Sequence, residues 1–178
     1  MKKPVLFLLA IGLVACGKSE APAERAAGSA TESVKAADSS RLDPASFNAC
    51  AVCHMPDGNG VQGAFPPIRE RMAKIAKLDG GREYLVVATK YGMTGTITID
   101  GVNYSGLMSP QGSVLNDAAL AGALNYGSIT LAPEAGADLK PFTESEVAAI
   151  SAALESPSIS TASEMRRALV EKHGELWP

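Results

Sequence analysis

Residues 50–54 read CAVCH, in which two cysteines stand three positions apart and a histidine follows directly. Two thiols at this spacing can each form a thioether with a vinyl group of one porphyrin, and the next imidazole then reaches the iron axially. The motif therefore predicts that Cys50 and Cys53 bind one covalent haem c and that His54 is an axial iron ligand. A chain with its cofactor fixed at three points in five residues has to fold around that cofactor.

Two other uses of the cysteine pair are possible. A thioredoxin-like redox pair needs a strand before the motif and a βαβ frame, and the sequence shows neither. A zinc site needs one or two more ligands, and the other candidates are Cys16 and His173. Because Cys16 has a different explanation and His173 lies near the C-terminus, haem is the favoured cofactor.

The first sixteen residues look like an export signal. A basic MKK is followed by twelve apolar residues, which are too few to cross a bilayer comfortably. The sequence LVAC at residues 13–16 resembles the lipobox of bacterial lipoproteins, which implies cleavage after residue 15 and lipid attachment at Cys16. An ordinary secretory signal with an incidental cysteine is the alternative. We expect a lipid-anchored protein on the periplasmic side of the inner or outer membrane.

The charge of the chain excludes a nucleic-acid partner. The formal net charge is −3, and removal of residues 1–15 leaves 14 basic and 19 acidic side chains, or −5. We therefore expect electron donors and acceptors with basic docking patches. Residues 16–42 are rich in Ala, Ser, Glu and Lys and predict a flexible tether with a reach of about 25–30 Å.

Local signals in the rest of the chain favour helices, long loops and one hairpin. We expect helices from Pro44 after an Asp43 cap, within residues 81–92, from near Asn116 to Gly127, and at the capping boxes Thr143/Glu146 and Thr161/Glu164, with a hairpin turn at Asp100-Gly101.

Four stretches, CAVCH, DGNGVQGAFPPI, GMTGTITIDGVNYSGLMSP and LNDAALAGALNYG, resemble in that order the class I bacterial monohaem cytochromes c. The resemblance covers about residues 43–127 and extends through the helix that starts at Thr143. It implies an all-α class I cytochrome c fold around one haem, with a small β-hairpin and a C-terminal helical extension. The expected domain is residues 43–156, and the extension is residues 157–178.

The resemblance also implies a ligand set. Met108 is the expected distal iron ligand, although Ser109 separates it from the proline that often follows this methionine directly. Met93 and His173 are the alternatives, whereas Met55 follows His54 too closely to reach the opposite side of the ring. The carbonyl of Pro66 is expected to accept a hydrogen bond from His54, and Phe65 and Ile68 are expected to line the ring. Candidate propionate contacts are Arg69, Arg82, Tyr91 and Tyr104.

A histidine and a thioether sulfur together fill both axial positions of the iron, which suits electron transfer and leaves no position for a substrate. We therefore expect a membrane-tethered one-electron carrier and not an enzyme. A fixed cytochrome subunit of a periplasmic dehydrogenase, with residues 157–178 contacting the partner, is the alternative, and a haem enzyme or gas sensor is a third possibility.

Overall fold

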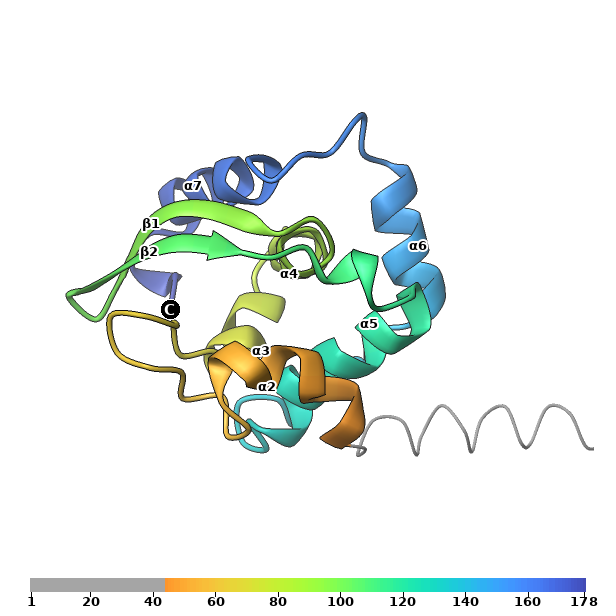
Figure 1. The fold of residues 1–178 in the computed structure, drawn as a ribbon, viewed down its shortest axis with the longest axis horizontal. Coiled ribbons are helices and arrows are strands. Elements are labelled where there is room, and N and C mark those ends of the chain that lie inside the picture. Colours follow the sequence, from red (N-terminus) through yellow and green to blue (C-terminus); the bar gives the residue numbers. More distant parts are fainter. Residues whose placement is uncertain (1–43) are drawn as a thin grey trace, which may run out of the picture.

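The computed structural model of the chain describes residues 44–178, which form six α-helices and a two-stranded sheet at one side of the fold (Figure 1). The expected signal peptide, the lipid site at Cys16, the tether and the Asp43 cap lie outside the described residues. The helices are α2 (Asn48–His54), α3 (Arg71–Ala76), α4 (Gly81–Tyr91), α5 (Asp117–Asn125), α6 (Glu144–Ala152) and α7 (Thr161–His173), and the strands are β1 (Met93–Ile99) and β2 (Val102–Met108). This helical architecture with one small sheet agrees with the expected fold class.

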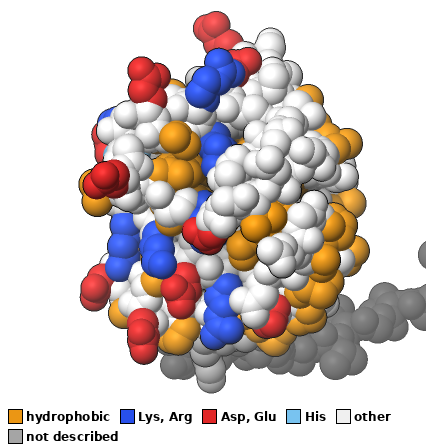
Figure 2. Space-filling model, turned by 90° about the vertical axis from the view of Figure 1, so that its left-hand side faces the viewer, with side chains coloured by type: hydrophobic (Ala, Val, Ile, Leu, Met, Phe, Trp, Pro, Cys, Tyr) orange, Lys and Arg blue, Asp and Glu red, His pale blue; other side chains and the backbone are white. Residues whose placement is uncertain are grey.

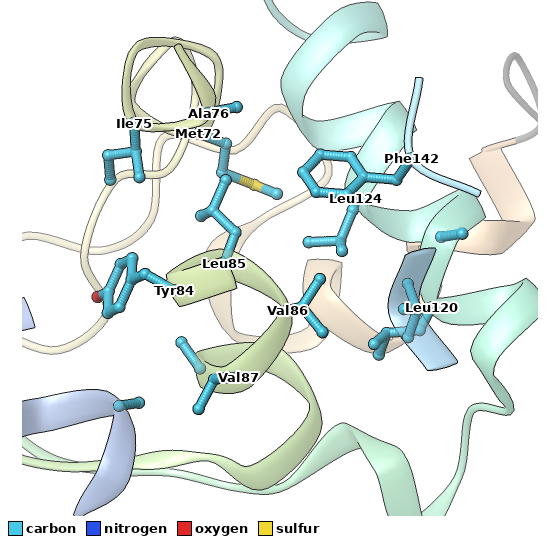
Figure 3. Close-up of a cluster of buried hydrophobic side chains, with 14 of the residues drawn as sticks. Met72, Ile75, Ala76, Tyr84, Leu85, Val86, Val87, Leu120, Leu124 and Phe142 are labelled. Carbon is cyan, nitrogen blue, oxygen red and sulfur yellow. The ribbon is translucent and has the colours of Figure 1, made fainter. Parts of the chain in front are cut away.

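Helix α4 lies at the centre of the fold and packs against α3, α5, α6 and α7. Its Leu85, Val86 and Val87 are all buried, and Figure 3 shows Met72 of α3 and Leu124 of α5 beside Leu85. Burial of each such side chain contributes about 1.5–3 kcal/mol to folding. The apolar run LVVA in α4 is therefore explained by its position between neighbouring helices.

The predicted hairpin is confirmed. Asp100 and Gly101 have φ of 50° and 77°, so the tight turn uses left-handed backbone at both central positions. The register pairs Ile99 with Val102 at the turn and Met93 with Met108 at the far end. Met108 is therefore the last residue of β2.

The start of α5 is confirmed, but its predicted end at Gly127 is wrong. The side-chain oxygen of Asn116 accepts a hydrogen bond from the Ala119 N–H at 2.9 Å, and helical backbone continues as a π-helical turn through Tyr126–Thr130. A Cβ at Gly127 would lie 2.6 Å from Sδ of Met72. The Met72 side chain of α3 therefore packs against Gly127, and this glycine does not end the helix.

The two predicted capping boxes have different outcomes. Thr143 caps α6 and accepts a hydrogen bond from the Glu146 N–H at 3.2 Å, while the Glu146 carboxylate binds Arg82 instead of returning to the cap. Thr161 does not cap α7, because it is the first helical residue and its hydroxyl accepts from the N–H of Ser158 at 2.9 Å.

The first helix is also not continuous from its predicted start. Residues Pro44–Phe47 form a 3-10 turn, and α2 begins at Asn48.

Residues 157–178 pack on the domain itself, since α7 lies against α4 and β1. The hydroxyl of Ser163 donates to the Thr94 carbonyl at 2.6 Å, and Lys172 forms an ion pair with Asp79 at 2.6 Å. His173 contacts the Asp79 carbonyl. Within residues 44–178, no helix is long and apolar enough to cross a membrane.

Candidate haem-binding site

Cys50, Cys53 and His54 lie on the last turns of the short helix α2. Both cysteines are free thiols and half-buried, while His54 is 7% exposed. Burial and the neighbouring Cys53 raise the pKa of Cys50 to about 11. The motif thus presents two reduced sulfurs and one buried imidazole from a single short helix.

The His54 ring is oriented by a backbone carbonyl. Its Nδ1 lies 2.9 Å from the carbonyl oxygen of Pro66, which is the acceptor that the resemblance implied. A carbonyl can only accept, so Nδ1 carries the proton and Nε2 keeps a free lone pair. Burial lowers the pKa of His54, although the bond to Pro66 opposes this effect. The neutral imidazole is the form that can bind a metal.

The loop after α2 holds Pro66 in place through Gly60. The Gly60 N–H donates to the His54 carbonyl at 2.9 Å, and Val61 and Phe65 form a bridge across the loop. A Cβ at Gly60 would lie 2.2 Å from the Phe65 oxygen and 2.7 Å from the Pro66 oxygen. The missing side chain lets the loop fold back closely enough for the Pro66 carbonyl to reach His54.

Two adjoining cavities, of about 390 and 100 Å³, lie beside α2 and the hairpin. The residues that line both of them are Cys50, His54, Pro66, Met93, Ile97 and Met108. A thiol, a neutral imidazole and two thioethers therefore surround one apolar space. Together with Cys53, which lines the larger cavity, these residues fit a haem, because they supply the thioether-forming groups, nitrogen and sulfur ligands, and apolar walls for the ring.

Among the methionines, only Met93 and Met108 line both cavities. The sulfur of Met93 accepts a hydrogen bond from the Tyr84 hydroxyl at 3.5 Å. Met72 lines the smaller cavity, and Met55 lines neither. His173, the other alternative ligand, also lines neither cavity. The assignment of Met108 as the distal ligand stays a prediction.

The expected wall residues lie at the cavities. Phe65 is 39% exposed and lines the larger cavity, and Ile68 lines the smaller one.

Three of the four candidate propionate contacts do not reach this site. Arg69 donates to the Leu131 carbonyl at 3.2 Å, Arg82 binds Glu146, and Tyr91 lines neither cavity. Only Tyr104 lines a cavity, the larger one.

Instead, the smaller cavity is lined by Arg71, Arg166 and Trp177, none of which the sequence had placed there. Trp177 is the single tryptophan of the chain, and its rarity was the available signal.

The comparison with family models gave no match. Among curated proteins, the chain is similar to cytochrome c-552 of Thermus thermophilus, with 39% identity over 99 residues, which cover 55% of this chain and 75% of that protein. A second cytochrome c-552, from a particular strain of the same species, is also 39% identical over 99 residues, with 66% of its length covered. Both similarities extend over 55% of this chain.

Proposed function

Because the chain belongs to the class I monohaem c-type cytochromes, we propose that it carries single electrons on a low-spin haem with His54 and Met108 as axial ligands. It is an electron-transfer protein with one covalent haem c, and it is not an enzyme. When bound, haem c supplies a one-electron couple, and a sulfur ligand raises its reduction potential. The protein orients the ligands and keeps water away from them.

The observation that supports this ligation is the position of the two side chains. His54 comes from α2 and Met108 from the end of β2, and both line the part of the site that the two cavities share. The hydrogen bond to Pro66 fixes the imidazole, and the strand fixes the backbone of Met108. Ligands held on regular elements change little between oxidation states, which suits fast electron transfer.

We further propose that partners dock over the larger cavity. Among residues 44–178, no Asp, Glu, Lys or Arg lines this cavity, and exposed Val52, Phe65 and Leu107 lie along it. Figure 2 shows one face of the molecule, on which hydrophobic side chains gather along one side and charges of both signs are interspersed along the other. An apolar contact would bring the redox centres close, while the overall negative charge attracts a basic partner from a distance.

The membrane tether belongs to the same proposal. Lipid attachment at Cys16 would hold the domain at the periplasmic side of a bacterial membrane, where residues 16–42 allow it to reach its partners. Mass spectrometry of the protein from membranes tests this proposal. Acyl chains on Cys16 are expected, and their loss in Cys16→Ser should release the protein from the membrane. An unmodified Cys16 would disprove the anchor.

The absorption spectrum of the purified ferric protein tests the carrier function. A low-spin spectrum, with no carbon monoxide binding by the ferrous form, is expected when both axial positions are filled. A high-spin spectrum would instead indicate an open iron, as in a haem enzyme or gas sensor. A partner that co-purifies in stoichiometric amounts would indicate a fixed subunit in place of a mobile carrier.

A further inference from the structure

At the end formed by α3 and the C-terminal segment, the smaller cavity is lined by positively charged side chains but by no acidic ones. Arg71 and Arg166 are its charged lining residues at neutral pH, and no carboxylate lines it. Within residues 44–178, neither guanidinium forms an ion pair with an Asp or Glu side chain, although Arg71 donates to the main-chain oxygen of Pro178. Burial lowers the pKa of Arg71, the charge of Asp100 opposes this effect, and the charge of Arg166 lowers the pKa further. Arg166 therefore lacks an acidic side-chain partner beside a second cation, and an anion from elsewhere would balance its charge.

Trp177 adds a buried donor without an acceptor. Its indole N–H is inaccessible to solvent and has no hydrogen-bond partner in the described part of the chain. The ring itself is held firmly, since it packs edge-on against Tyr84 with centroids 5.7 Å apart and lies 5.7 Å from the Arg166 guanidinium carbon. An unsatisfied buried N–H costs about 1–3 kcal/mol, so a partner for it is expected.

The haem itself can supply the missing groups. Its two propionates are carboxylates, each able to accept hydrogen bonds from a guanidinium and an indole N–H. The larger cavity, on the other side of the site, is lined by Cys53 and the exposed apolar side chains. The end of the smaller cavity that Arg71 and Arg166 line is therefore the one that matches the propionates.

We propose that Arg166 and Trp177 bind a haem propionate, so that residues 157–178 are a haem-binding segment of this domain. Arg71 holds the end of that segment, because its guanidinium donates to the Pro178 carbonyl. The inference needs the covalent haem but not the proposed axial ligands. It also gives the C-terminal segment a role in place of partner contact.

Nuclear magnetic resonance of the reduced holoprotein gives a direct test. The chain has one tryptophan, so its single indole N–H signal is unambiguous. Nuclear Overhauser contacts between this proton and propionate methylene protons are expected. Their absence, with the methylenes in contact with other residues, would overturn the proposal. A high-spin ferrous iron would disprove the proposed axial pair but not this proposal. Binding of carbon monoxide would then make the iron diamagnetic, so that the contact between the indole proton and the propionate methylenes can still be measured.

The reduction potential gives a second test with a matched control. Arg166→Met should lower the potential, because an unpaired propionate favours the ferric state. Arg167→Met removes the same charge one residue away, from a side chain that lines neither cavity, and should change the potential less. Equal shifts in the two variants would overturn the proposal. Trp177→Phe keeps the ring against Tyr84 and should lower the potential through loss of the N–H alone.

Discussion

Met93 and Met108 are cross-strand partners at the open end of the β1–β2 hairpin, and both line the cavities beside His54. Two sulfurs are thus available on the same side of the site. They differ in their surroundings, since the sulfur of Met93 already accepts a hydrogen bond from Tyr84. The pair gives a matched test of which methionine binds the iron.

Met108→Ala should remove the red sulfur-to-iron charge-transfer band of the ferric protein, whereas Met93→Ala should keep it. Loss of the sulfur ligand should also lower the reduction potential by a substantial part of the roughly 0.8 V that axial ligands span. Absorption spectra and potentiometric titration of both variants measure this. A band that survives Met108→Ala and disappears in Met93→Ala would transfer the ligand role to Met93.

Gly60→Ala should destabilise the protein and disturb the His54 hydrogen bond. Its Cβ would meet the Phe65 and Pro66 oxygens at a φ of 66°. Left-handed backbone alone costs about 1–2 kcal/mol for alanine, and the clash should add to that. Gly63→Ala is the control, because its φ is 76° and nothing lies within 4 Å of its Cβ. Denaturant unfolding should show a larger loss for Gly60→Ala, and equal losses would contradict the close approach at Gly60.

The Arg82–Glu146 pair should make stability depend on acid. The Arg82 hydrogen bond lowers the pKa of Glu146 below its ordinary value of 4.5. The stabilisation is therefore fully present above pH 4.5 and is lost as pH falls through the lowered pKa. Glu146→Gln should reduce the free energy of unfolding at neutral pH by about 1 kcal/mol. It should also make the free energy of unfolding depend less on pH in the acid range. Glu144→Gln, an exposed change in the same helical turn, should leave the pH dependence of unfolding in the acid range as in the wild type.

Leu107→Ser should slow electron transfer to a basic partner without altering its dependence on salt. Leu107 is 63% exposed at the rim of the larger cavity, whereas Val114, the control, is 70% exposed and lines neither cavity. Loss of a central contact costs about 1–2 kcal/mol, or roughly 5- to 30-fold in affinity. Stopped-flow rates over a range of ionic strength measure both effects. A rate unchanged by salt in the wild type would contradict the role of charge.

The sequence predicted those features that depend on neighbouring residues. The CAVCH spacing, the Asp100-Gly101 turn, the helix start near Asn116 and the Thr143 cap each act within about one turn of the chain, and the structure contains all four. Thr161 does not cap α7, because its hydroxyl accepts a hydrogen bond from the N–H of Ser158, three residues earlier. Gly127 does not end the helix, which continues as a π-helical turn to Thr130, and it packs against Met72, which is far away in the sequence.

The residues at the basic end of the cavity could be found only from the tertiary structure. Arg69 and Arg82 are nearer the motif in sequence, but they bind Leu131 and Glu146 on other sides of the fold. Arg166 and Trp177 reach the cavity because α7 packs back over α4 and β1. The sequence by itself determined the cofactor, because covalent attachment needs only five adjacent residues. Only the tertiary structure decided which distant side chains surround that cofactor, because long-range packing brings them there.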